Sequence, residues 1–193
     1  EPNELVLSYA TRGMEPVRGF PEFMQLLPEL IERNKNLKVV IAGADRRAYS
    51  YDAPGNDGSW KNYMLEKMGE KEKEHIVFTG LLDYNDYRSL LWRTNLHCYL
   101  TRPYVTSWSL FEAAACGTRL AVNKSPATDN IMEEGSVTWL NLDSSDQMID
   151  KIDEGINSVN DNESELLSKF KLGNCIAQWE RIINKGLTTS AER

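Results

Sequence analysis

Short apolar runs alternate with segments of helical periodicity along almost the whole chain. Leu37–Gly43 (LKVVIAG) is a continuous apolar run that ends in glycine, which is typical of a strand buried on both faces of a sheet. Arg18–Arg33 instead places its apolar residues three and four positions apart, and this spacing predicts a helix with one buried face. Pro28 within that segment predicts a kink or the start of a second turn.

The same criteria predict six strands, each followed by a helix or a polar loop. The predicted strands are Glu4–Ala10, Leu37–Gly43, His75–Gly80, Asn95–Leu100, Thr118–Asn123 and Ser136–Asn141. The predicted helices are Arg18–Arg33, Trp60–Gly69, Asp83–Arg93, Ser107–Cys116, Pro126–Glu134, Ser144–Val159 and Glu163–Lys185. Ala44–Ser59 is polar and rich in Gly, Asp and Tyr, so we expect a long loop there.

This alternation predicts the α/β class, because buried parallel strands need helices on both sides. We expect a doubly wound, Rossmann-like parallel sheet of about six strands with helices on both faces, plus C-terminal helices. The 193 residues fit a single domain, residues 1–193. In such folds a ligand lies beyond the carboxyl ends of the strands, so the segments that follow the strands are the place to look for chemistry.

Charge and cysteine content narrow the class of function. The chain has 22 Lys and Arg against 29 Asp and Glu, a net charge of −7, which argues against a nucleic-acid partner but allows a local basic pocket for one anion. Cys98, Cys116 and Cys175 are odd in number and widely spaced, a pattern that indicates reduced thiols in a cytosolic protein. No run of 18 apolar residues occurs, so we expect no transmembrane segment.

Two arginines flank the segment that follows the first predicted strand. Arg12 and Arg18 enclose Gly13–Val17, and Gly19 precedes the helix. Two guanidinium groups, a flexible glycine and a helix N-terminus together suit an anion such as a phosphate. Two solvated surface arginines are the alternative interpretation.

A stronger candidate is Pro103–Gly117 (PYVTSWSLFEAAACG), the segment after the fourth predicted strand. Ser107 or Ser109 can cap a helix whose free amides point back toward the strand ends, where they suit a phosphate. Glu112 either reaches a ligand hydroxyl or only completes a capping box with Ser109. Trp108 is a core anchor or part of a ligand wall, and we favour the core.

Several common chemistries lack their motifs. The sequence contains no Gly-x-Gly-x-x-Gly, no Walker phosphate loop and no Gly-x-Ser-x-Gly. Only His75 and His97 are present, and His97 stands inside an apolar strand where we expect a core residue. No Asp-x-Asp occurs, so a Mg²⁺ or Mn²⁺ ion has no evident carboxylate pair to hold it.

Four segments, taken in order, resemble a known family. They are Arg12 with Arg18-Gly19, the strand Val39–Gly43, the strand Val77–Gly80 and the helix motif Glu112–Gly117. In this order and at these distances they resemble the nucleotide-sugar-binding C-terminal domain of GT-B glycosyltransferases, specifically the large retaining group of family 4. The spacing from Arg12 to Arg18 is about one residue longer than is usual in that group.

The resemblance implies a glycosyltransferase domain that binds a nucleoside diphosphate sugar and supports metal-independent, configuration-retaining transfer of a hexose. Arg12 and Arg18 would be the catalytic residues, holding the donor diphosphate without a metal ion or other cofactor. Glu112 would accept hydrogen bonds from the ribose hydroxyls, and the backbone at the end of the strand His75–Gly80 would meet the base. The implied donor-binding residues are Gly13, Gly80, Leu81, Leu82, Tyr104, Ser107, Trp108, Ser109, Leu110, Phe111 and Glu112.

Two positions depart from the family pattern. Tyr104 stands eight positions before Glu112, where the family has a second Glu that touches the sugar, so the resemblance does not carry the sugar's identity. Asn130 stands close to another usual Glu. A non-catalytic scaffold of the same fold, or a nucleotide-sugar epimerase with that fold, are the alternative functions.

The length suggests one half of a two-domain enzyme, since a GT-B enzyme has two Rossmann-like halves. We expect the partner of this chain to be an N-terminal acceptor domain that is absent here, and the isolated domain to be inactive. The expected compartment is the cytoplasm, with peripheral membrane association through the absent domain as an option. Trp179, Ile182 and Ile183 would face that domain, or form the core stripe of their own helix.

Overall fold

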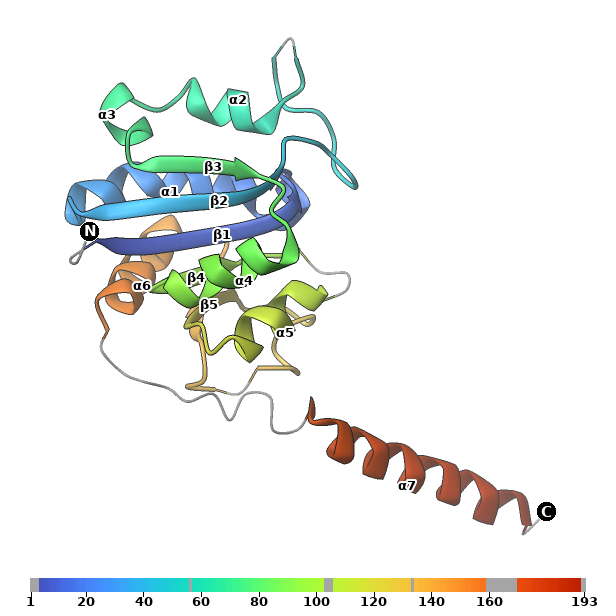
Figure 1. Cartoon of the computed structure of the whole chain (residues 1–193). Coiled ribbons are helices and arrows are strands. Elements are labelled where there is room, and N and C mark those ends of the chain that lie inside the picture. Colours follow the sequence, from blue (N-terminus) through green and yellow to red (C-terminus); the bar gives the residue numbers. More distant parts are fainter. Residues whose placement is uncertain (1–3, 56, 103–105, 133, 159–169, 192–193) are drawn as a thin grey trace.

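The computed structural model of the chain describes residues 4–55, 57–102, 106–132, 134–158 and 170–191. Within these residues the strands form one sheet whose order is β3-β2-β1-β4-β5-β6, and every neighbouring pair is parallel. The strands are β1 Leu5–Gly13, β2 Leu37–Ala44, β3 Ile76–Gly80, β4 Leu96–Tyr99, β5 Leu120–Asn123 and β6 Thr138–Leu140. The predicted α/β class and parallel sheet are therefore confirmed (Figure 1).

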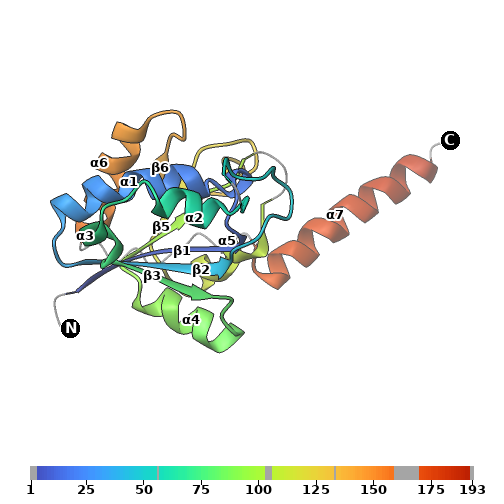
Figure 2. The ribbon, with the colours of Figure 1, turned by 90° about the horizontal axis from the view of Figure 1, so that it is seen from above.

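Helices cover both faces of the sheet, as Figure 2 shows from above. The helical segments are η1 Pro16–Arg18, α1 Phe20–Arg33, α2 Trp60–Leu65, α3 Glu70–Lys73, α4 Tyr84–Arg93, α5 Trp108–Ala115, α6 Ser145–Asn157 and α7 Leu172–Ala191. Helix α1 continues through Pro28. The helix predicted over Trp60–Gly69 ends earlier, at Leu65, and the short α3 follows it.

Two hydrophobic cores hold these layers together. The larger one packs α1 and α6 against one face of the sheet, with Phe23, Leu27 and Ile152 fully buried. The smaller one packs α4 and α5 against the other face, where Leu110 and Ala113 are fully buried. Burying one such aliphatic or aromatic side chain contributes roughly 1.5–3 kcal/mol, so the packing of the helices determines where the strand ends lie.

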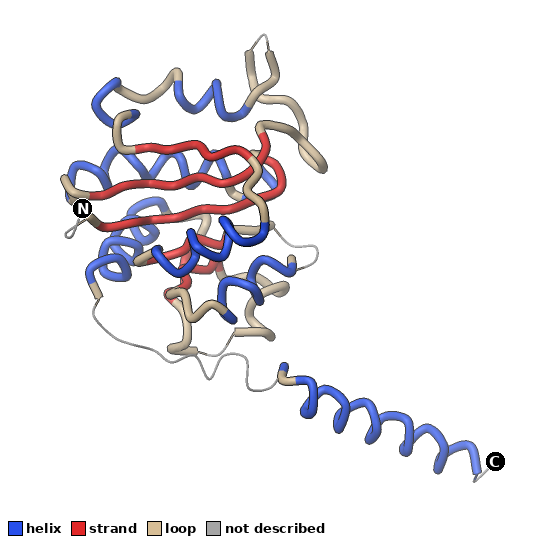
Figure 3. The backbone as a smooth tube through the Cα atoms, viewed as in Figure 1, coloured by secondary structure: helices blue, strands red, loops and turns tan. Residues whose placement is uncertain are grey.

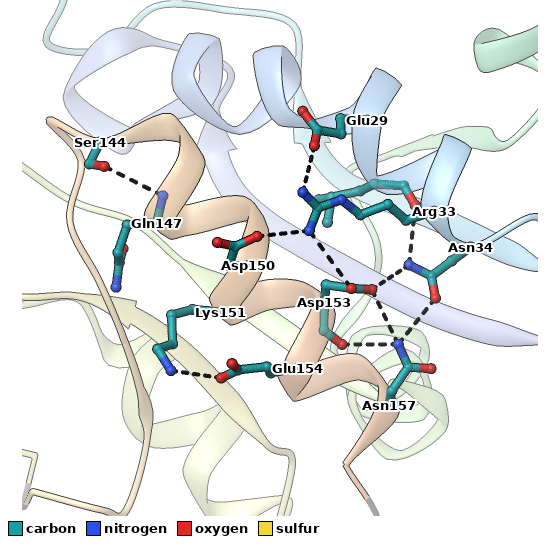
Figure 4. A network of polar contacts seen from close by, with 11 residues as sticks. Glu29, Arg33, Asn34, Ser144, Gln147, Asp150, Lys151, Asp153, Glu154 and Asn157 are labelled. Carbon is teal, nitrogen blue, oxygen red and sulfur yellow. Dashed lines mark hydrogen bonds and ion pairs between the residues drawn. The ribbon is translucent and has the colours of Figure 1, made fainter.

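A polar network joins the ends of α1 and α6 (Figure 4). Arg33 donates to Asp150 at 2.8 Å and forms an ion pair with Glu29 at 2.6 Å. Asn34, which follows α1, donates to the Asp153 carboxylate at 2.7 Å. The ion pairs of Arg33 with Glu29 and Asp150 are exposed and contribute little to stability. Asn34 is buried, and its bond to Asp153 fixes the orientation of α6 on α1.

The prediction of a helix over Pro126–Glu134 is wrong. The described residues of that segment form consecutive turns. The physical reason is Thr128, a fully buried residue whose hydroxyl donates to the Asn123 carbonyl at 2.8 Å and accepts from the Ser125 amide at 3.1 Å. A side chain that binds nearby backbone groups in this way competes with helix formation.

The C-terminal helix begins later than predicted. Residues 163–169 of the predicted Glu163–Lys185 helix lie outside the described residues, and α7 begins at Leu172. It projects away from the body of the domain (Figure 1). Trp179, Ile182 and Ile183 are 65%, 61% and 56% exposed, so they do not form a core stripe within this chain.

Candidate functional site

A cavity of about 400 Å³ opens at the carboxyl edge of the sheet. The chain order reverses here, because β1 has β2 on one side and β4 on the other, and such a switch point leaves a crevice beyond the strand ends. The loops that surround the crevice, including the long one between β2 and α2, are tan in Figure 3. The cavity is lined by Ala10, Thr11, Arg12, Arg18, Ala42, Gly43, Tyr49, Leu81, Leu82, Tyr87, Tyr99, Leu100, Ser107, Trp108 and Ser109.

Both candidate arginines line this cavity. Arg12 is exposed at the end of β1, whereas Arg18 is half-buried. The Arg18 guanidinium donates to the Thr101 hydroxyl at 3.2 Å, and its backbone carbonyl accepts from the Tyr9 hydroxyl at 2.7 Å. The surface-charge interpretation does not fit Arg18, because both its ends are fixed at the cavity.

A buried amide supports the partner of Arg18. Asn123, at the end of β5, accepts from the Thr101 amide at 2.7 Å and donates to the Thr101 carbonyl at 2.9 Å. It thereby ties the end of β5 to the residue that follows β4 and holds the Thr101 hydroxyl toward Arg18. Sequence analysis missed this chain of contacts, since nothing in the pattern distinguishes Asn123 from an ordinary strand residue.

The start of α5 forms another wall. Ser107 is the N-cap residue, and among the described residues no side chain caps the helix amides. The Ser107 hydroxyl is instead 2.6 Å from the Ser109 hydroxyl, and the Ser107 amide donates to Tyr99 Oη at 2.9 Å. Ser107, Trp108 and Ser109 line the cavity, so the first turn of α5 lies there without a side-chain cap from the described residues to offset the partial positive charge of its amides.

Two sequence-based interpretations of this helix are wrong. Ser109 lies inside α5 and not at its N-cap, so the capping box of Ser109 with Glu112 does not form. Trp108 is 83% exposed and lines the cavity, so it is not a core anchor. The first turn of α5 lies at the cavity, whereas Ala113 and Ala114, farther along the helix, are buried in the smaller core.

The remaining candidates lie around the cavity without lining it. Leu110 is fully buried in the smaller core, and Phe111 packs its ring against Phe170 with centroids 5.1 Å apart. Glu112 is half-buried beside Tyr87, and after burial it is the main cause of the raised pKa of that phenol.

Two glycines and Tyr104 complete the candidate set. Gly80 is exposed, has φ 72° and directly precedes the lining residue Leu81. A Cβ on Gly13 would lie 2.6 Å from the Arg46 carbonyl oxygen, so this position needs glycine to let two loops approach. Tyr104 falls outside the described residues.

Three tyrosines that sequence analysis did not single out also line the cavity. They are Tyr49 in the β2–α2 loop, Tyr87 in α4 and Tyr99 in β4. The Tyr87 hydroxyl is buried and has no hydrogen-bond partner among the residues that the structure describes. The rule that ligands bind beyond the strand ends points to the loop that contains Tyr49. That loop has no hydrophobic periodicity, so the sequence does not distinguish Tyr49 from its neighbours.

The described part of the chain holds no group of three or more His, Cys, Asp or Glu side chains placed to bind a metal ion. No helix among the described residues is both long and apolar enough to span a membrane.

Comparison with known proteins places the chain among glycosyltransferases. Residues 22–170 match the family model described as "Glycosyl transferase-like". No curated protein matches the sequence.

Solved structures share the fold. The C-terminal domain of the glycosyl transferase group 1 family protein LpcC from Francisella tularensis matches with a TM-score of 0.69 and 16% identity, over 86% of this chain and 87% of that one. An E. coli structure described as trehalose-6-phosphate bound with UDP-2-fluoro glucose matches with a TM-score of 0.71 and 13% identity, over 96% of this chain but 44% of that one. An α,α-trehalose-phosphate synthase (UDP-forming) from Burkholderia vietnamiensis matches with a TM-score of 0.67 and 12% identity, over 97% and 46%.

Proposed function

The chain belongs to the glycosyl transferase-like family, and we propose that its cavity binds the diphosphate and nucleoside of a nucleoside diphosphate sugar. The observation that carries this proposal is the meeting of Arg12, Arg18 and the uncapped start of α5 at one cavity. Guanidinium groups and helix amides are the donors that hold a diphosphate without a metal ion.

The opposite wall suits a nucleoside. Leu81, Leu82 and Tyr49 line it, beyond the ends of β3 and β2. Glu112, next to Tyr87 at the wall, is proposed to accept hydrogen bonds from the ribose hydroxyls. Support for this donor class comes from the E. coli structure of the same fold, which is described as bound with UDP-2-fluoro glucose.

We propose a configuration-retaining hexose transfer for the whole enzyme. The acceptor hydroxyl would attack the anomeric carbon from the face that carries the leaving diphosphate. As the new bond between the acceptor oxygen and the anomeric carbon forms, the bond between that carbon and the phosphate oxygen breaks. A phosphate oxygen of the leaving group takes the proton of the hydroxyl. Arg12 and Arg18 would stabilise the negative charge that develops on the leaving diphosphate. One such donor is worth roughly 2–4 kcal/mol of transition-state free energy.

The acceptor would come from a second domain. This chain spans 44% and 46% of the two trehalose-related structures that it matches, and 87% of the isolated LpcC C-terminal domain. We therefore propose that the chain is the donor-binding half, and that catalysis needs an N-terminal acceptor half. The epimerase alternative calls for a histidine in the cleft, but His97 is fully buried and His75 binds the Leu37 carbonyl at the other end of the strands.

Titration calorimetry on the chain tests the donor site. With EDTA present, we expect the chain to bind at least one of UDP, GDP, ADP and TDP with a dissociation constant between about 1 μM and 1 mM. Arg18→Ala should weaken that binding by roughly 10- to 100-fold, because a hydrogen bond to a charged group contributes about 1.5–3 kcal/mol. Arg93→Ala is the matched control, because Arg93 donates to the Glu4 backbone at the far edge of the sheet.

Absence of binding by all four nucleotides would remove the proposal and favour the non-catalytic scaffold. Binding that needs Mn²⁺ or Mg²⁺ would remove the role given to the arginines. An equal loss in Arg18→Ala and Arg93→Ala would mean that net charge, and not the cavity, sets the affinity.

A further inference from the structure

A buried carboxylate joins the segment between Arg12 and Arg18 to the long loop after β2. Glu15, in the β1–α1 loop, is 1% exposed. Its Oε2 atom accepts hydrogen bonds from three successive backbone amides, those of Ala48, Tyr49 and Ser50, at 3.0, 2.9 and 2.9 Å. Hydrogen bonds to a carboxylate are about twice as strong as neutral ones, so this contact fixes the backbone around Tyr49.

Two further contacts join the same loops. The Val17 amide donates to the Ser50 hydroxyl at 3.1 Å. Gly13 allows the Arg46 carbonyl to approach within 2.6 Å of the position that a Cβ would occupy. Together with Glu15, these contacts hold the two loops as one unit. We call it the loop clasp, formed by Gly13, Glu15 and Val17 on one side and residues 46–50 on the other.

The clasp presents one of two neighbouring tyrosines to the cavity. Tyr49 and Tyr51 are similarly exposed, at 67% and 71%. Tyr51 packs its ring against Trp60, with centroids 5.9 Å apart. Tyr49 instead lines the cavity. Its loop follows β2, the neighbour of β3, and Leu81 and Leu82 follow β3.

The cavity therefore has a cationic part and an aromatic part. Arg12, Arg18 and the start of α5 form the first. Tyr49, Leu81 and Leu82 supply the second from the loops that follow the neighbouring strands β2 and β3. A nucleoside diphosphate has the same two parts, an anionic diphosphate and a flat aromatic base. Every base offers a face on which an aromatic side chain can stack.

We propose that Tyr49 packs its ring against the nucleoside of the bound donor and that Glu15 is the positioning residue that holds Tyr49 there through the loop clasp. The inference rests on the proposed donor site and adds to it a contact residue and its support. Glu15 itself is covered by the two loops and touches no ligand.

Three variants and two ligands test the Tyr49 contact by calorimetry. Tyr49→Ala should weaken binding of the tightest of UDP, GDP, ADP and TDP on the order of 10-fold, but leave the affinity for inorganic pyrophosphate unchanged. Arg18→Ala should weaken both ligands. Tyr51→Ala is the matched control, because it removes an equally exposed ring from the same loop outside the cavity, and it should change neither affinity.

Glu15→Gln tests the positioning role through a double-mutant cycle. The glutamine side chain has the same size as glutamate but lacks the negative charge to which the three backbone amides donate. We expect it to weaken nucleoside diphosphate binding by no more than Tyr49→Ala does, and to add little in the Tyr49→Ala background, because its effect passes through that ring. Hydrogen exchange should show faster exchange of the amides of residues 48–50 in the variant. Ser50→Ala, which removes the Val17 contact, is a milder substitute if Glu15→Gln does not fold.

The outcomes distinguish failure of the donor site from failure of the Tyr49 contact or of the role of Glu15. A chain that binds none of the four nucleotides overturns the donor site and this inference together. Wild-type binding with an unchanged Tyr49→Ala affinity, or an equal loss for pyrophosphate, overturns the Tyr49 contact alone. Additive effects of Glu15→Gln and Tyr49→Ala, or unchanged exchange at residues 48–50, overturn the positioning role.

Discussion

Acidification should destabilise the protein through one buried histidine. His97 lies in β4, fully buried, opposite Ser8 in β1, whose hydroxyl is 2.7 Å from Nδ1. Its Nε2 atom has no hydrogen-bond partner in the described part of the chain. Burial lowers the pKa of His97 from 6.5 to about 4, because the charged ring would lose its hydration while Nε2 gains no partner in exchange among the described residues.

The direction and size of the effect follow from proton linkage. Between pH 6.5 and about 4 the unfolded chain binds a proton at His97 that the folded chain does not, so the free energy of unfolding falls as the pH falls. Above pH 6.5 both states are neutral and the penalty is absent. The gap between the two pKa values corresponds to about 3 kcal/mol when complete, and to about 2 kcal/mol at pH 5.

Urea unfolding followed by circular dichroism and by tryptophan fluorescence measures this loss. His97→Asn supplies the reference, because the amide cannot titrate while the carboxylates and His75 remain as they are. The loss of unfolding free energy between pH 8 and pH 5 should be about 2 kcal/mol larger in the wild type than in the variant. Equal losses in both proteins would refute the reasoning, whatever the absolute stability of the variant.

Three further substitutions should change stability by amounts that thermal or urea unfolding can resolve. Asp83→Ala removes the N-cap side chain of α4 and should cost about 1 kcal/mol, with an unchanged unfolding midpoint as the contrary result. Gly43→Ala places a Cβ 2.2 Å from the Thr11 carbonyl oxygen at φ 145° and should cost at least about 2 kcal/mol, whereas wild-type stability would contradict the close approach. Ile152→Ala empties a fully buried position of the larger core and should cost about 2–5 kcal/mol, while the exposed neighbour Lys151→Ala should cost little, and similar costs would contradict the packing.

The sheet was predictable because each strand carries its own local signal. The run Val39–Gly43 is apolar at every position, which only a strand with helices on both faces requires. Segment 126–134 was not predictable in this way, since its composition allows a helix and the decision rests on the tertiary position of the Thr128 hydroxyl. Trp108 was misjudged because large aromatic residues are usually buried, and only the orientation of α5 shows that it faces the cavity.

Some residues of the candidate site were likewise predictable from local sequence, and others were not. Arg12 and Arg18 were found because they directly follow a recognisable strand, and the strand-end rule needs no side-chain geometry. Tyr49 was missed because its place depends on Glu15, which lies 34 residues earlier in the chain. Long-range contacts of this kind leave no periodicity in the sequence.

The strand order also has a consequence for the time course of folding. β1, β2 and β3 lie next to each other in chain order, whereas the contact between Ser8 and His97, which joins β1 to β4, spans 89 residues. Contacts between distant residues must first overcome the entropy of closing the intervening loop, so we expect pulse-labelled amides of β1 and β2 to become protected before those of β4 and β5. Protection of β4 first would contradict this order. On the ribosome, the cationic wall built on β1 would then form only after β4 and α5 have been made, so a nucleotide could stabilise the nascent chain only once synthesis has passed Ala115, the last residue of α5.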